Sequence, residues 1–308
     1  MTTAQTFQGL GGRGLAVWRD VLRCGPAGPS GRMRQDHLIR RQVSSAVRLD
    51  VVGLTGGVGC SHVAARLGVL LAWRRGARVL GVDAGLGATF TRLTQAVAQA
   101  AAETGPAAPV RRLHASASPN RTDEATAGML VGMAGLRVAP VGLPGTGQAT
   151  PADWRSSVAG ATRFFDVVVT DWGHRVPGVD FETSLAGAHA VALVCRTRRS
   201  DIESAIRVAQ ATARHVPCLV CAVDVDGTGA APARAGAGWG IIPVVAWPFL
   251  ADPAVPVPPA AARAAVIDLA AKLMGMAADG PPPADTGVPT SVPTRASRAA
   301  SPQPGGGR

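Results

Sequence analysis

Lysine is almost missing from this chain: Lys and Arg together number 31, and Lys272 is the only lysine. Long apolar runs are missing too, which excludes a helix that crosses a bilayer. Residues 1–14 have no apolar stretch behind a basic one, so we expect no secretory signal. The five cysteines follow no regular spacing. They therefore predict reduced thiols in a cytoplasmic protein rather than a disulfide framework.

The net charge of +11 is unevenly spread. Residues 1–48 contain eight arginines against only Asp20 and Asp36. Such an arm could bind an acidic protein surface, an anionic membrane surface or DNA. Alternatively, the arginines of this arm form a basic, solvated surface that binds no partner. A short amphipathic helix is expected over residues 15–23, and this helix is the better candidate for any membrane contact.

The chain divides into three parts by composition. Residues 1–48 form a basic arm, in which a second helix is expected over 32–47. Residues 49–278 have the apolar content and length of one large domain. Residues 279–308 are rich in Pro and Gly and have almost no large apolar side chain. This tail is predicted to be disordered, because it cannot bury enough surface to offset its ordering entropy.

Apolar segments alternate with helical patterns through the middle part. This alternation predicts an α/β fold of three layers, with a mainly parallel sheet covered by helices on both faces. The expected strands are 49–54, 78–82, 136–141, 165–170, 190–195, 217–223 and 241–247. The expected helices of the domain are 61–75, 152–163, 200–214 and 260–276.

The most informative segment is a glycine-rich loop between the first strand and the following helix. It reads Thr55-Gly-Gly-Val-Gly-Cys-Ser-His62. Glycines let backbone N–H groups turn inward, and the dipole of the helix favours negative charge at its N-terminus. The next strand ends in a carboxylate, Asp83. The pattern therefore predicts a phosphate-binding site, or alternatively a tight connection that is kept only for its geometry.

The segment resembles the deviant Walker A motif of the ParA/MinD family of P-loop ATPases, Lys-Gly-Gly-x-Gly-Lys-Thr-Thr. The strand that ends at Asp83 is similar to switch I of that family, and the strand that ends at Asp171 is similar to Walker B and switch II. The Gly28-Pro29-Ser30 approach and the Arg-rich helix after it resemble MinD-like proteins associated with type VII secretion.

The resemblance implies ATP or ADP with Mg²⁺ as the cofactor. It places the magnesium ligands at Ser61, Asp83 and Asp171. The residues that it implies for nucleotide binding are Gly56, Gly57, Val58, Gly59, Cys60, Ser61, His62, Asp83 and Asp171.

Three departures from the family motifs concern hydrolysis. The two lysine positions hold Thr55 and Cys60, and the second switch I acid is replaced by Gly85. Phosphoryl transfer depends on positioned positive charge and an oriented water, so efficient turnover is not expected. Arg175 or Arg196 could supply a replacement cation in space. Without one, the site could bind nucleotide weakly or not at all.

These departures favour a pseudo-ATPase that acts as a regulatory or scaffold protein, in type VII secretion if the finer resemblance holds. Its partner would be a second copy, a catalytically intact homologue or a secretion component. The alternative is a slow genuine ATPase that partitions or positions DNA or protein cargo and binds DNA through the Arg-rich arm. A redox or nucleophilic role for Cys60, at a helix N-terminus, is a further alternative.

Overall fold

The computed structural model describes residues 29–43, 45–75, 78–85, 93, 131–133, 136–140, 148–228, 242–248 and 259–279. The strands of these residues form one sheet of eight, in the order β3-β4-β2-β5-β1-β6-β7-β8. Only β3 is antiparallel to its neighbour. The predicted mainly parallel α/β sheet is confirmed. The strands are β1 (Val47–Gly53), β2 (Val79–Asp83), β3 (Val131–Met133), β4 (Leu136–Pro140), β5 (Val167–His174), β6 (Ala190–Arg196), β7 (Cys218–Val223) and β8 (Val244–Trp247).

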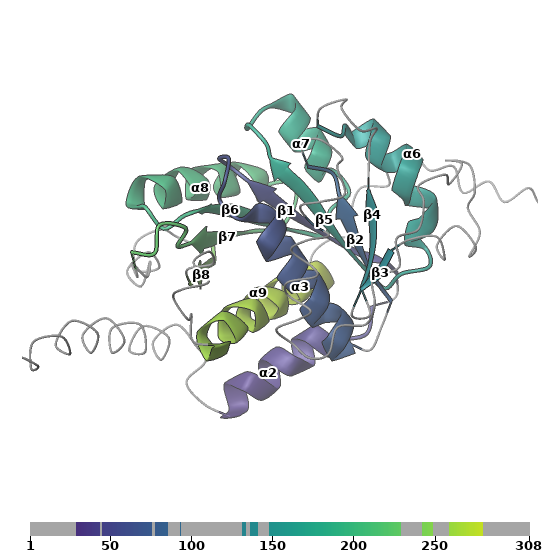
Figure 1. Ribbon diagram of the computed structural model, residues 1–308, viewed down its shortest axis with the longest axis horizontal. Coiled ribbons are helices and arrows are strands. Elements are labelled where there is room, and N and C mark those ends of the chain that lie inside the picture. The colour runs from purple at the N-terminus through teal and green to yellow at the C-terminus, as the bar shows by residue number, and fades with distance from the viewer. Residues whose placement is uncertain are drawn as a thin grey trace, which may run out of the picture.

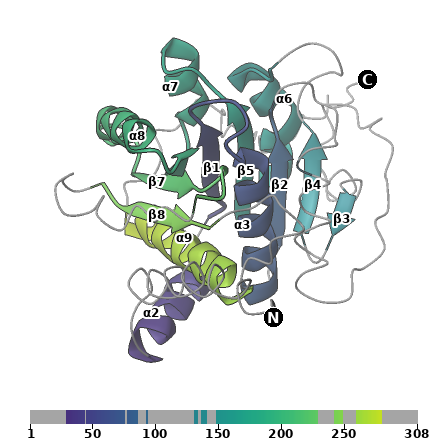
Figure 2. The same cartoon turned by 60° about the vertical axis from the view of Figure 1, so that its left-hand side comes forward.

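Helices cover both faces of the sheet, as Figures 1 and 2 show. One face carries α2 (Pro29–Arg40), α3 (Cys60–Arg75) and α9 (Pro259–Asp279). The other face carries α6 (Pro151–Thr162), α7 (Val179–Leu185) and α8 (Arg199–Thr212). Each layer has its own buried core, because successive side chains of a strand point to opposite faces. Leu193 of β6 belongs to one core and Val194 to the other. The predicted three-layer arrangement is therefore confirmed.

Helix α2 is part of the packed body. It lies against α9 and α3, with Ile39 buried in their shared core (Figures 1 and 2). The predicted helix over 32–47 is wrong at its end, since α2 stops at Arg40 and β1 already begins at Val47. At this end, Arg75 of α3 donates from Nη1 to the carbonyls of Ile39 and Arg41 at 2.7 and 2.8 Å. These bonds cap the C-terminus of the helix. The boundary proposed between residues 48 and 49 falls inside β1.

Other differences are small or concern short elements. Strand β5 runs four residues further than predicted, to His174, because it pairs with β1 on one side and with β2 on the other. The sequence reading missed β3 and α7. The predicted helix over 15–23 and the tail from residue 280 onward lie outside the described residues. Among the described helices, none is both long and apolar enough to cross a membrane.

Candidate functional site

The glycine-rich loop lies at the carboxyl edge of the sheet. Strand β1 ends at Gly53 and α3 begins at Cys60. Between them, Gly57 and Gly59 have φ values of +71° and +82°, a region that side chains with a Cβ rarely adopt. A Cβ at Gly57 would meet no atom within 4 Å, so backbone conformation rather than space requires glycine there. The loop and the N-terminus of α3 thus form a backbone cradle of the kind that binds anions.

The structure brings the three predicted motifs together at this edge. Asp83 at the end of β2 is the register partner of Asp171 in β5, and Asp171 is also adjacent to Val51 of β1. Both carboxylates are buried. In the loop, Thr55, Gly56 and Gly57 are exposed, Val58 and Cys60 are buried, and Gly59, Ser61 and His62 are partly exposed.

Cys60 faces the carboxylate of Asp171. Its Sγ lies 3.2 Å from Asp171 Oδ1, to which the thiol donates, and 3.5 Å from the carbonyl of Val51. The backbone N–H of Gly173 donates to the same Oδ1 at 2.9 Å. A neutral thiol therefore lies against the Walker B-like carboxylate at the position where the family resemblance implies a lysine.

The thiol stays protonated. Burial raises the pKa of Cys60 well above its ordinary value, and the negative charge of Asp171 raises it further. A thiolate is the reactive form of cysteine, so this environment suppresses nucleophilic and redox chemistry. The expectation that the N-terminus of α3 would favour the thiolate is wrong, because burial and the adjacent carboxylate outweigh the helix dipole.

Gly85 lies two residues after Asp83 and is buried. Its backbone N–H donates to Asp83 Oδ1 at 3.2 Å, and a Cβ at this residue would lie 3.5 Å from the same oxygen. The carboxylate that the family uses to help orient the attacking water is thus replaced by a backbone turn. Asp224, at the end of β7, also serves a turn: its Oδ1 accepts from the N–H and the hydroxyl of Thr228.

The only lysine of the chain and one of the two arginines proposed as substitutes have structural contacts of their own. Lys272 lies on α9, where its ammonium pairs with Asp268 at 2.6 Å. The guanidinium of Arg175 is buried and donates to the carbonyls of Trp172, Ala84 and Ala149. It thereby ties the end of β5 to the segment after Asp83.

Arg196 is different. It ends β6, the strand beside β1, and by alternation its side chain shares a face with Val194, in the core of α3. Its Nε is buried and has no hydrogen-bond partner among the described residues.

The residues around the glycine-rich loop therefore match only part of what a magnesium–nucleotide complex needs. The backbone cradle suits a phosphate group, and Ser61 lies in the first turn of α3. The two lysine positions carry no charge, and Asp171 Oδ1 already accepts the Cys60 thiol. Within the described ranges, no group of three or more His, Cys, Asp or Glu is arranged to hold a metal ion.

His62, one residue after Ser61, is a neutral acceptor. Arg66, one turn further along α3, donates from Nε to His62 Nε2. Burial lowers the pKa of His62 from 6.5 to about 4, and the positive charge of Arg66 adds to this shift. The unfolded chain binds the proton more readily than the folded protein between these two values. Stability from this group is therefore fully present above about pH 6.5 and is lost as the pH falls toward 4.

We expect His62→Gln to flatten this pH dependence, because glutamine can still accept from Arg66 but cannot be protonated. Between pH 7 and 4.5 the wild type should lose roughly 2 to 3 kcal/mol more stability than the variant. Urea unfolding at both pH values measures the difference. Because His189, whose pKa burial also lowers, is present in both proteins, its contribution cancels. Equal losses in the two proteins would contradict the assignment.

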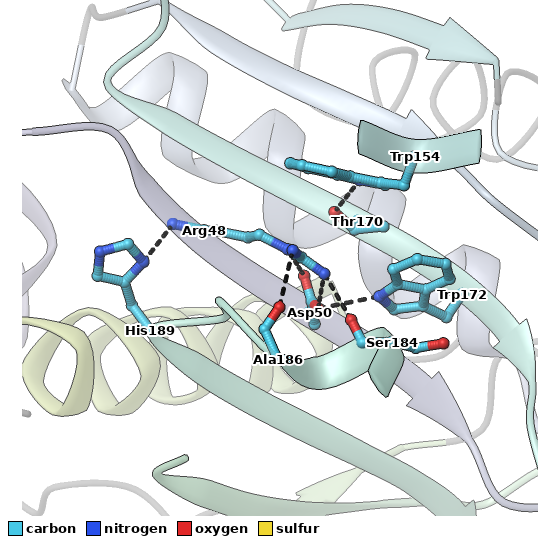
Figure 3. A network of polar contacts seen from close by, with 8 residues as sticks. All are labelled: Arg48, Asp50, Trp154, Thr170, Trp172, Ser184, Ala186 and His189. Atoms are coloured by element: carbon cyan, nitrogen blue, oxygen red, sulfur yellow. Dashed lines mark hydrogen bonds and ion pairs between the residues drawn. The ribbon is translucent and has the colours of Figure 1, made fainter. Parts of the chain in front are cut away.

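A buried polar network lies on the opposite face of β1 and was missed by sequence reasoning (Figure 3). Arg48 donates from Nε and Nη2 to the two oxygens of Asp50, at 2.9 and 2.7 Å. Its Nη2 and Nη1 also donate to the carbonyls of Ser184 and Ala186, at 2.6 and 3.3 Å, at the C-terminus of α7. Trp172 Nε1 donates to Asp50 Oδ2 at 2.9 Å.

Two indoles complete the network around the guanidinium of Arg48. The ring of Trp154 lies 4.2 Å and that of Trp172 5.7 Å from its central carbon, and Trp154 Nε1 donates to Thr170 Oγ1 (Figure 3). Trp172 directly follows Asp171, and its side chain points to the other face of β5. The network therefore fixes the switch II-like end of β5 to β1, α6 and α7.

The sequence held one signal for this network. Arg48 and Asp50 are two residues apart inside an otherwise apolar strand, so both point to the same face. A charge in the middle of a buried strand needs a partner, and each is the other's nearest candidate.

Comparison with known proteins gives only distant likenesses. No protein-family model matches the chain, and no curated protein matches it either. Among solved structures, a plasmid partition protein from Borrelia burgdorferi is similar at 12% identity and a TM-score of 0.48, over 74% of this chain and 99% of that one. A ParA family ATPase from Chlorobium tepidum is similar at 14% and 0.47, over 76% and 97%.

A third similar structure is the septum site-determining protein MinD in complex with Mg-ADP from Pyrococcus horikoshii, at 14% identity and a TM-score of 0.47, over 76% of this chain and 94% of that one. Similar solved structures thus include ParA and MinD proteins. Identities of 12 to 14% with TM-scores below 0.5 say nothing about the site of this chain.

Proposed function

We propose that this protein is a pseudo-ATPase of ParA/MinD type, which uses the P-loop scaffold as a regulatory or scaffold protein and does not turn ATP over. One observation carries the proposal: the thiol of Cys60 donates to Asp171 where a lysine would be needed. The sequence resemblance to MinD-like proteins of type VII secretion makes a secretion complex the first setting to test.

The contacts around Asp171 favour a segment that keeps one conformation over a segment that switches between two. Its Oδ1 accepts from both Cys60 and Gly173. The next residue, Trp172, is completely buried and bonded to Asp50, and Arg175 donates to three carbonyls. A nucleotide-dependent switch has to move in this region, so these contacts favour one conformation.

Calorimetric titration with ATP and ADP, with and without Mg²⁺, tests the proposal together with a phosphate-release assay. We expect weak or no binding and no Mg²⁺-dependent release above the background of an Asp171→Ala variant. Turnover at a rate ordinary for an intact ATPase, abolished by Asp171→Ala, would contradict the proposal. Release that Asp171→Ala leaves unchanged would indicate a contaminating enzyme.

A slow genuine ATPase, partitioning or positioning DNA or protein cargo, is the second candidate. The observation that favours it is Arg196, whose Nε has no hydrogen-bond partner among the described residues and whose strand adjoins the glycine-rich loop. In this case, slow Mg²⁺-dependent release should disappear in both Arg196→Ala and Asp171→Ala. DNA binding through the arm should weaken steeply with salt.

A further inference from the structure

Two large apolar side chains are exposed on the layer of α2 and α3. Met33 of α2 is 72% exposed and Trp73 of α3 is 64% exposed. Helix α3 starts at the glycine-rich loop with Cys60, so Trp73 in its last turn lies about 20 Å along the helix axis from the loop, at 1.5 Å per residue. Figures 1 and 2 show α2 beside that far end of α3. This surface is therefore separate from the nucleotide-like site.

A continuous chain of contacts joins the two helices here. The guanidinium of Arg74 lies 4.8 Å from the centroid of the Trp73 ring. Its Nη1 donates to Asp36 Oδ1 on α2 at 3.0 Å, and Arg40 Nε donates to Asp36 Oδ2 at 2.8 Å. Met33 lies three residues before Asp36, on the same side of α2. We call these five residues (Met33, Asp36, Arg40, Trp73 and Arg74) the Trp73 patch.

The Trp73 patch is basic overall. Its one carboxylate, Asp36, is shared by two arginines. Arg32 and Arg34 are exposed on the same helix. The indole is held against a guanidinium before any partner arrives, which lowers the ordering cost of binding through it.

We propose that the Trp73 patch is a docking surface for another protein, whose complementary surface is acidic around an apolar pocket that takes the indole. Tryptophan, methionine and arginine are the residues enriched at protein interfaces, and tryptophan and arginine dominate binding hot spots. The positive charge of the patch favours an acidic partner. The inference rests on the proposed function, since a scaffold acts through protein contacts, and it names the chemistry of the partner.

Other occupants fit the patch less well. The phosphates of a DNA backbone supply negative charge but no apolar pocket for the indole of Trp73. Helix α2 also turns its apolar residues Leu38 and Ile39 toward α9 and the core rather than outward, so it has no broad face to enter a bilayer. A second copy would bring one basic patch against another. Residues 1–28 and 280–308 of the chain itself each carry more arginine than aspartate.

The test uses random 12-residue peptides displayed on phage and selected on the full chain. Selected peptides should combine acidic residues with at least one large apolar residue. Trp73→Ala should weaken their binding by about thirtyfold, the loss typical of a hot-spot residue. Arg40→Glu should weaken it more at low salt than at high salt. The matched control is Val176→Ala, which truncates an equally exposed apolar residue beyond β5 and should change nothing.

The proposal is overturned if Trp73→Ala weakens the binding of no selected peptide, or if the peptides whose binding it weakens are not acidic. It is also overturned if Trp73→Ala removes binding to duplex DNA or to phosphatidylserine vesicles and leaves peptide binding intact. None of these readouts involves ATP. Failure of the docking surface is therefore distinguishable from failure of the proposed pseudo-ATPase, which would show as turnover.

Discussion

Replacing Cys60 with lysine is expected to raise the affinity for ATP, by tenfold to about a thousandfold. A unit charge about 4 Å from a phosphate contributes roughly 4 kcal/mol at an effective dielectric constant of 20, and each 1.4 kcal/mol is a factor of ten. Burial of the ammonium and its pairing with Asp171 reduce the gain below that limit. Calorimetry with Mg-ATP, on the variant and the wild type side by side, measures it.

Cys60→Met is the matched control, because it also removes the thiol that donates to Asp171 but adds no charge. We expect it to bind ATP no better than the wild type. If Cys60→Lys is folded and its affinity for ATP is unchanged, the loop lacks something other than a cation. The contact between Cys60 and Asp171 would then no longer support the proposed function. Turnover is not expected in either variant, because Thr55 and Gly85 remain.

Replacing Arg48 with methionine is expected to destabilise the protein by about 3 to 5 kcal/mol, since it leaves the carboxylate of Asp50 buried with no cation beside it. Asp50 is completely buried, and the side chain of Arg48 is 12% exposed. The carbonyls at the C-terminus of α7 lose their donor in the same variant. Chemical denaturation in urea measures the change in the free energy of unfolding.

Two further variants test whether the buried pair causes this loss. Arg199→Met breaks an ion pair of similar length with Glu203, but Arg199 is 84% exposed, so solvent screens the pair and its loss should hardly change the free energy of unfolding. Combining Arg48→Met with Asp50→Asn removes both charges and keeps an acceptor for Trp172 Nε1. We expect the double variant to be more stable than Arg48→Met alone. A double variant that is less stable would show that packing around Trp154, not charge, dominates.

The fold was predictable because strand and helix periodicity are local properties of the sequence. The loop and the two carboxylates were found for a related reason: motifs at the ends of parallel strands meet at one edge. The state of Cys60 was not predictable. It depends first on burial, which raises the pKa of the thiol, and then on the carboxylate of Asp171, more than a hundred residues away, which raises it further.

The end of α2 shows the same limit. A helix was predicted to residue 47, but α2 ends at Arg40, and the carbonyl groups at this end accept from Arg75, more than thirty residues later. Likewise the Arg48 network depends on Trp172, which the pairing of β5 with β1 brings into place, and on Trp154, which the packing of α6 on the sheet brings there. Contacts between distant segments decide these features, and a reading of local pattern does not contain them.

The packing of α2 also determines where the chain can be shortened. Starting the protein at residue 49 would strip Ile39 from its core and discard Arg48 together with the first pairing of β1. Loss of DNA binding in such a truncation would then report misfolding. A version that begins at Pro29 retains all of these contacts, so the basic residues before it can be tested without damaging the body they precede.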